Sequence, residues 1–305
     1  MRRNMKKNTK HKSDHGVEMN DKAKYTWEEA VEILRNTDEH HDLIFNSYLT
    51  SDLVDNCRRF HASPEFEEIL RILNEHIAPH SKVLDIPAGN GIATYSFIKE
   101  GFEVTAIEPD PSYTVGRGAI EFVLNAENIH DGVTIIDGYG ESIPLANETF
   151  DAVYVRQGLH HARDLQTMVI EISRVLKKGG VLIASREHVV NNYSGSLKSF
   201  LDSQPDHQLY AGEHAFTHRD YKKAFTMAGF SVISDMGPYD SVINIYPSNF
   251  GDLRRRLLGS TIGRVCSSIL PSDLVWHMGF WLLKKLKRPG RLHSFVAIKQ
   301  GKSTC

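Results

Sequence analysis

Long apolar runs and paired cysteines are both scarce in this sequence. No stretch approaches the roughly 18 to 20 apolar residues that a membrane-spanning helix needs, and the first residues lack the apolar core of a signal peptide. The three cysteines, Cys57, Cys266 and Cys305, are far apart and form no CxxC pair. We therefore expect a cytoplasmic protein without a disulfide framework, and the sequence predicts no metal site.

The charged residues are unevenly distributed along the 305-residue chain, whose 41% hydrophobic and 24% charged residues are typical of a globular protein. Residues 1–24 hold eight Lys/Arg against three Asp/Glu, and residues 252–302 hold eleven against two. Basic ends could favour an anionic partner, although a solvated tail and a basic surface helix explain them more simply. Because residues 1–24 contain almost no apolar side chains, we expect them to form a disordered basic tail.

The pattern of apolar residues divides the remainder into a helical region and an α/β domain. Residues 25–80 show helical spacing after Thr26 and again after Ser63-Pro64, so they predict an N-terminal cap. From residue 81 to 305, short apolar runs alternate with helical stretches, as in a parallel sheet with crossover helices. We expect seven strands, at 82–86, 103–108, 133–136, 150–156, 181–186, 231–234 and 293–299, with inserts at about 188–216 and 236–291.

The strongest local signal is a buried strand that runs into a glycine turn and a helix at residues 83–91. Gly89 and Gly91 allow a ligand to approach the backbone, and the helix N-terminus offers free N–H groups. Glu108 ends the next strand, 19 residues after Gly89, where a carboxylate can accept both ribose hydroxyls. Together these features predict a site for an adenosine-containing cofactor.

The glycine pattern distinguishes between cofactors. A dinucleotide fingerprint is GxGxxG, whereas this turn reads Pro-Ala-Gly-Asn-Gly-Ile at 87–92 and lacks the first and third glycines. This argues against a nucleotide-dependent oxidoreductase, which is one alternative. A non-catalytic module that keeps the fold and binds the cofactor is another.

The chain resembles the class I S-adenosylmethionine (SAM)-dependent methyltransferases, and in particular those with a type 11 methyltransferase domain. Its turn matches their DxGxGxG motif except that Pro87 replaces a glycine. Further segments resemble their acidic second motif, adenine segment, fourth strand and fifth-strand junction, in the family's order, at 107–112, 138–145, 150–161 and 174–182. The resemblance implies a three-layer Rossmann-like sandwich whose mostly parallel sheet ends in an antiparallel strand. It also implies SAM as the cofactor.

The resemblance further implies which residues contact SAM. Asp85 and the turn would lie near its methionine part, Glu108 would hold the ribose, and Gly140 would offer its N–H to the adenine, although Tyr139 replaces the usual aspartate. The whole predicted cofactor set is Asp85, Pro87, Ala88, Gly89, Asn90, Gly91, Glu108, Pro109, Tyr139, Gly140, Glu141, Arg156 and Gln157.

The acceptor is less well specified than the cofactor. Arg156-Gln157-Gly158 stands where many amino-methylating relatives carry Asn/Asp-Pro-Pro-aromatic, and no nucleic-acid module is evident. We therefore expect methylation of a hydroxyl on a small-molecule, sugar or lipid-linked acceptor, and a general base would assist that transfer. The candidates for the base are His161 and His214, followed by His160, Glu187, His188 and Glu213.

The second insert contains an apolar segment followed by a cationic run, at 274–288. Such a helix can lie at a membrane surface or meet a lipid-linked acceptor. Packing of its Trp and Leu residues on the protein's own core is the simpler interpretation. The sequence leaves the oligomeric state open.

Overall fold

The structure is a computed structural model that describes residues 24–210 and 212–301, so residues 1–23 of the predicted basic tail lie outside it. Its centre is a sheet in the order β3-β2-β1-β4-β5-β8-β7, with β6 beside β5. The paired strands are parallel except at β8, which runs antiparallel to both β5 and β7. The strands are β1 (Lys82–Asp85), β2 (Glu103–Ile107), β3 (Val133–Ile136), β4 (Phe150–Arg156), β5 (Leu176–Val190), β6 (Phe216–Thr217), β7 (Phe230–Met236) and β8 (Arg291–Lys299).

The predicted α/β sheet with its antiparallel last strand is confirmed, and it differs from the prediction by one strand. The addition is β6, only two residues long, which pairs with Val189 and Val190 at the end of β5. Strand β5 itself is longer than predicted, because it begins at Leu176 and continues beyond Arg186 into the first insert. A strand of two residues, such as β6, is too short to produce a recognisable strand pattern in the sequence.

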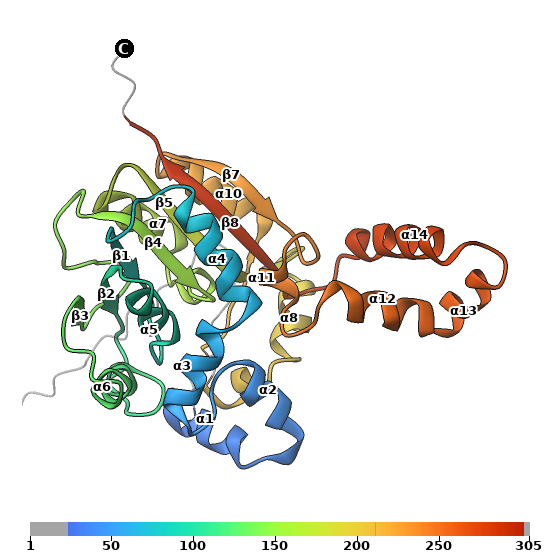
Figure 1. Cartoon of the computed structure of the whole chain (residues 1–305), viewed down its shortest axis with the longest axis horizontal. Helices are drawn as coiled ribbons and strands as arrows, with labels where there is room; N and C mark the ends of the chain where they lie inside the picture. The colour runs from blue at the N-terminus through green and yellow to red at the C-terminus, as the bar shows by residue number, and fades with distance from the viewer. Residues whose placement is uncertain (1–23, 211, 302–305) are drawn as a thin grey trace, which may run out of the picture.

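Helices cover both faces of the sheet, which gives three layers (Figure 1). Successive residues of a strand point to opposite faces, so Val83 and Ile183 pack in one core while Leu84 and Leu182 pack in the other. The first core lies under α3, α4, α5 and α6, and the second lies under α7 and α10. The covering helices are α3 (Leu53–His61), α4 (Pro64–Asn74), α5 (Ile92–Lys99), α6 (Arg117–Ala126), α7 (Leu165–Val175) and α10 (His218–Met227).

The N-terminal helices begin at capping residues that the sequence indicates. The side chain of Thr26 accepts from the N–H of Glu29 in a capping box, and Ser63 caps a helix with Pro64 at its start. Helix α3 was not predicted, because its few apolar residues stand among several charged ones. The remaining elements of this region are α1 (Trp27–Arg35), η1 (Asp38–His40) and α2 (His41–Asn46).

The two inserts adopt different arrangements. The first contains α8 (Ser196–Leu201) and α9 (Pro205–Tyr210), and α9 packs on α1. In the second, three helices extend away from the sheet as an arm (Figure 1). They follow the short α11 (Val242–Ile245) and are α12 (Phe250–Gly259), α13 (Thr261–Ser267) and α14 (Ser272–Lys285).

Helix α14 does not pack on the protein's core, so the simpler interpretation of 274–288 is wrong. Val275 is its one buried residue, whereas Trp281 and Leu282 are more than half exposed. Ile262 of α13 and the nearby Ile269 are also exposed. None of the helices described between residues 24 and 301 is both long enough and apolar enough to cross a bilayer.

Candidate functional site

The glycine turn lies at the carboxyl end of β1, where parallel sheets bind their ligands. Gly89 and Gly91 have φ angles of 53° and 84°, in the left-handed region that favours glycine. A Cβ added at Gly89 would meet no other atom within 4 Å, so the space beside it is open. At Gly91 the same addition would come within 2.9 Å of Ile120, so the turn also packs closely against α6. The turn therefore offers room for a ligand on one side.

The carboxylate of Glu108 faces this turn. Its Oε2 accepts from the N–H of Gly89 at 2.7 Å, and its Oε1 accepts from the N–H of Asp110 at 2.9 Å. Each oxygen keeps a second lone pair, so both remain able to accept from a ribose hydroxyl. Burial raises the pKa of Glu108, while the two backbone donors lower it. The turn and the carboxylate thus meet at one place, as an adenosyl group requires.

Asp85 provides a second buried carboxyl group at the end of β1. Its Oδ2 accepts from Thr94 Oγ1 at 2.6 Å, and burial raises its pKa to about 7. A cationic ligand beside Asp85 would favour the ionised carboxylate and lower that pKa again. Asp85 is the residue predicted to lie near the methionine part of SAM. Its ionisation therefore depends on whether a positive charge lies beside it.

Other predicted cofactor residues have partners within the protein. The N–H of Ala88 donates to the carbonyl of Ile107, and the side chain of Asn90 donates to the carbonyl of Tyr48 at 2.7 Å. Pro87 lies against Gly158, where an added Cβ would be 2.3 Å from its ring. Residues 87–91 are thus held by β2, by the N-terminal region and by the turn after β4.

The predicted adenine segment lies partly at the surface. Tyr139 is 57% exposed, with the Arg163 guanidinium 5.9 Å from its ring centre. Gly140 is tightly packed, since an added Cβ would come within 2.7 Å of Met168. The Glu141 carboxylate accepts from the N–H of Arg163 at 2.7 Å, so it holds the turn before α7. In this segment, the side chain of Tyr139 and the backbone are therefore the groups most available to contact an adenine ring.

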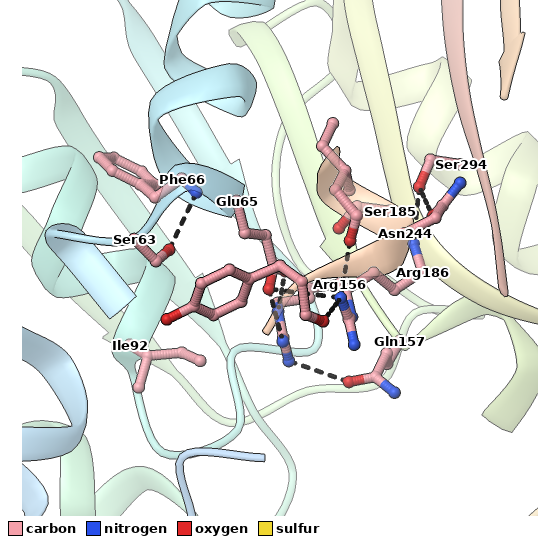
Figure 2. A network of polar contacts seen from close by, with 12 residues as sticks. Ser63, Glu65, Phe66, Ile92, Arg156, Gln157, Ser185, Arg186, Asn244 and Ser294 are labelled. Atoms are coloured by element: carbon pink, nitrogen blue, oxygen red, sulfur yellow. Dashed lines mark hydrogen bonds and ion pairs between the residues drawn. The ribbon is translucent and has the colours of Figure 1, made fainter. Parts of the chain in front are cut away.

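Arg156 belongs to a buried network that the sequence did not reveal (Figure 2). Its guanidinium donates to both oxygens of Glu65, at 2.8 and 3.2 Å, and to Gln157 Oε1 at 2.9 Å. Arg186 lies 3.6 Å from the same Glu65 carboxylate and donates to the carbonyls of Ile243 and Tyr246. The network joins α4 to β4, β5 and α11, so the predicted cofactor residues Arg156 and Gln157 have a structural role here. Nothing in the sequence around Glu65 distinguishes it from a surface helix acid.

The candidate base residues gather where β4 and β5 end. Glu187 accepts from the backbone N–H groups of Gly158, Leu159 and His160, at 3.0 to 3.1 Å, and its Oε2 lies 2.8 Å from His160 Nδ1. These contacts form the turn that carries η2 (Leu159–His161). Glu187 therefore positions the backbone and the His160 ring, and it is inaccessible to an acceptor because it is fully buried.

The other histidines and Glu213 surround His160. The His160 ring is centred 4.3 Å from that of His161 and 4.8 Å from that of His188. Glu213 lies 3.6 Å from His160 Nε2 and 3.7 Å from His161 Nε2. Burial lowers the pKa of His160 well below its usual range and that of His188 to about 3. His161 differs from both because its side chain is 38% exposed.

The first insert reaches the cofactor side of the same edge. The pKa of Tyr210 is raised first by burial and then by the charges of Asp110 and Glu108, so its hydroxyl is within electrostatic range of those carboxylates. Its ring is centred 5.7 Å from that of Trp27, and the N–H of Lys24 donates to the carbonyl of Leu209. Helices α1 and α9 therefore stand together next to the predicted ribose site.

Comparison with known proteins agrees with this geometry. Residues 84–184 match a family model described as a methyltransferase domain. A demethylmenaquinone methyltransferase from Thermobifida fusca is 33% identical over 101 residues, which are 33% of this chain and 41% of that protein. A sterol 24-C-methyltransferase from Gibberella zeae is 35% identical over 109 residues, which are 35% of this chain and 28% of that protein. The chain thus spans less than half the length of these relatives.

The fold also has solved counterparts. The geranyl diphosphate C-methyltransferase from Streptomyces coelicolor, in complex with Mg²⁺, geranyl-S-thiolodiphosphate and S-adenosyl-L-homocysteine, superposes with a TM-score of 0.52 at 12% identity. The superposition covers 76% of each chain. At this identity the likeness concerns the fold.

Proposed function

We propose that this chain, whose residues 84–184 match a methyltransferase domain, is a class I SAM-dependent methyltransferase that transfers the methyl group of SAM to a hydroxyl of a small-molecule acceptor. The observation that carries the proposal is the hydrogen bond from the Gly89 N–H to Glu108, beside open space. It brings the two groups that an adenosyl cofactor needs into one site. Sugars and lipid-linked metabolites belong to the proposed acceptor class.

The protein's part in the reaction is alignment. SAM supplies a methyl group that is already activated on a sulfonium centre, so proximity and exclusion of water provide much of the rate enhancement. Glu108 would accept hydrogen bonds from the ribose hydroxyls, and the N–H groups at the start of α5 would bind the cofactor's carboxylate. Asp85 ends β1 just before the turn, where its ionised carboxylate would balance the positive charge of the ligand.

His161 is the proposed proton acceptor for the acceptor's hydroxyl. It is the most accessible imidazole at the ends of β4 and β5, and Glu213 Oε1 lies 3.7 Å from its Nε2, where it can stabilise the imidazolium. His214 is the second candidate and is in the same insert as Glu213. His160 and His188 are less suited to the role, because burial favours their neutral form so strongly.

The decisive experiment incubates the untagged protein with methyl-labelled SAM and fractionated cell extract, then identifies the labelled product. Label on oxygen in a small molecule supports the proposal, while label on carbon or nitrogen keeps the transferase and rejects the hydroxyl acceptor. The variant His161→Ala should lower kcat without changing the affinity for SAM. An unchanged kcat would remove His161 from the mechanism.

Calorimetric titration with SAM and with NADH tests the cofactor separately. Glu108→Ala should weaken SAM binding, whereas the matched control Glu103→Ala, an exposed carboxylate on the same strand, should not. Binding of NADH without SAM would favour an oxidoreductase. Tight SAM binding with no transfer to any fraction would favour a non-catalytic module.

We also propose that the arm contacts a membrane carrying anionic lipids, through residues 274–288 and the adjacent α13. Exposed apolar side chains lie beside a strongly basic sequence, since residues 252–302 hold eleven Lys/Arg and two Asp/Glu. Apolar insertion and attraction to anionic headgroups act together in interfacial helices. Such contact would bring the site to a lipid-linked acceptor.

A further inference from the structure

Three potential metal ligands meet at the carboxyl ends of β4 and β5. His160, His188 and Glu213 each offer one ligand atom, and these atoms lie within 4.8 Å of one another. They are in η2, in the extension of β5 and in the first insert. These residues are up to 53 positions apart in the sequence, so they do not form a recognisable metal-binding motif.

Both histidines are already oriented by their other ring nitrogen. His160 Nδ1 is 2.8 Å from Glu187 Oε2, and His188 Nδ1 is 2.8 Å from the carbonyl oxygen of Gly290. An N–H that donates to a carboxylate or a carbonyl leaves Nε2 with its lone pair, and metal-ligating histidines are held in this way. Three backbone N–H groups fix Glu187 in turn. The outer partners of a metal site are thus in place.

Acidic side chains surround the cluster. Glu187 lies against His160, and Asp206 lies close to Glu213. In the part of the chain that the structure describes, neither glutamate forms an ion pair with a lysine or an arginine. A divalent ion would bring positive charge to these carboxyl groups.

The spacing of the ligand atoms is also suitable. His160 Nε2 and Glu213 Oε2 are 3.6 Å apart, which is longer than a hydrogen bond. Around a tetrahedral zinc ion with bonds of about 2.0 to 2.1 Å, neighbouring ligand atoms lie about 3.3 Å apart. The His160–Glu213 pair is close to this spacing, and side-chain rotations would have to bring the ligand atoms that lie up to 4.8 Å apart to it.

A second cluster of similar composition has different surroundings. His218, Asp235 and His293 also bring three ligand atoms together. However, Asp235 pairs with Lys222 at 3.3 Å, and Arg291 Nε lies 3.3 Å from His293 Nε2. Two cationic side chains beside the potential ligands oppose a metal ion, so this cluster serves as a control.

We propose that His160, His188 and Glu213 bind one first-row divalent cation of the zinc type, with its fourth position open. Two imidazoles and one carboxylate form the ligand set of many catalytic zinc sites, which keep a position for water or substrate. His161 Nε2 lies 3.7 Å from Oε1 of Glu213, so it is next to this ligand set. An oxygen of the acceptor could occupy the open position, and this role alone depends on the proposed methyl transfer, whereas binding of the metal does not.

Metal binding can be measured directly on the untagged full chain after treatment with EDTA. Titration calorimetry with ZnCl₂, and the visible spectrum with CoCl₂, should give one tight site that is lost in His188→Ala. Glu187→Gln, which removes an outer partner, should weaken binding about 10- to 100-fold. The control His218→Ala should bind as the parent does. SAM affinity in each variant reports whether the protein is folded.

Three outcomes would overturn the proposal. One is the absence of stoichiometric binding to the parent protein, and another is binding that survives both His188→Ala and Glu213→Gln. The third is loss of binding in His218→Ala alone, which would assign the metal to the other cluster. If zinc binds as proposed but no methyl transfer is found, the metal site stands and the proposed function fails.

Discussion

Replacement of Glu65 by glutamine should destabilise the fold, because it removes one partner of a buried ion pair. The Glu65 carboxylate is fully buried and neutralises Arg156, while the second guanidinium, of Arg186, lies 3.6 Å away. Removing one partner of a buried ion pair costs about 3 to 5 kcal/mol, because the remaining charge stays buried without compensation. Glutamine retains one acceptor oxygen, so we expect about 3 kcal/mol.

Urea unfolding at neutral pH, followed by circular dichroism, measures this loss. A loss of about 3 kcal/mol corresponds to a fall in Tm of about 6 °C, because 1 kcal/mol lowers the Tm of a large domain by at least about 2 °C. The matched control is Glu68→Gln, also in α4, because Glu68 pairs with an exposed Arg71 at 2.8 Å. That change should cost less than about 1 kcal/mol. If both variants lost the same free energy of unfolding, the reasoning would be refuted, because burial would then not determine how much an ion pair stabilises the fold.

Three further predictions concern the ligands. Because Asp85 has a pKa of about 7 and is protonated below it, the affinity for SAM should fall as the pH drops from 8 to 6, and calorimetry should show no such fall in Asp85→Asn. Gly89→Val, which fills the open space and strains a φ of 53°, should weaken SAM binding at least tenfold in the same assay. In sedimentation with vesicles, the protein should bind phosphatidylglycerol but not phosphatidylcholine, and Trp281→Ser should reduce binding while Ile170→Ser, an exposed residue on the body, should not. Dimers that form through the arm in analytical ultracentrifugation, without vesicle binding, would replace the membrane proposal.

The sheet could be predicted from the sequence because its signal is local. Val83 and Leu84 belong to different cores, and β4 and β5 likewise bury both faces, so these strands appear in the sequence as short continuous apolar runs. The relation between Gly89 and Glu108 also follows from local rules, since neighbouring parallel strands end at the same edge. Topology therefore places these two groups together once β1 and β2 are assigned.

The network around Glu65 could not be predicted in the same way. Glu65 and Arg156 are 91 positions apart, and each stands in a segment whose local pattern is ordinary. Arg156 was assigned to the cofactor by resemblance alone, whereas its partner comes from an N-terminal helix outside the resemblance. Long-range pairs of this kind depend on how α4 packs over β4, which periodicity does not encode.

The histidine cluster shows why the choice of a base remained open at the sequence level. All six candidates lie near the ends of β4 and β5, yet their roles diverge through contacts that link distant segments. Glu187 is occupied by three backbone N–H groups, His188 by a carbonyl 102 residues away, and His161 keeps an exposed edge. Since a base must reach the acceptor while a metal ligand must be held still, exposure separates His161 from His160 and His188. The same turn after β4 can therefore present an exposed imidazole and a buried one side by side, and their long-range partners decide which is which.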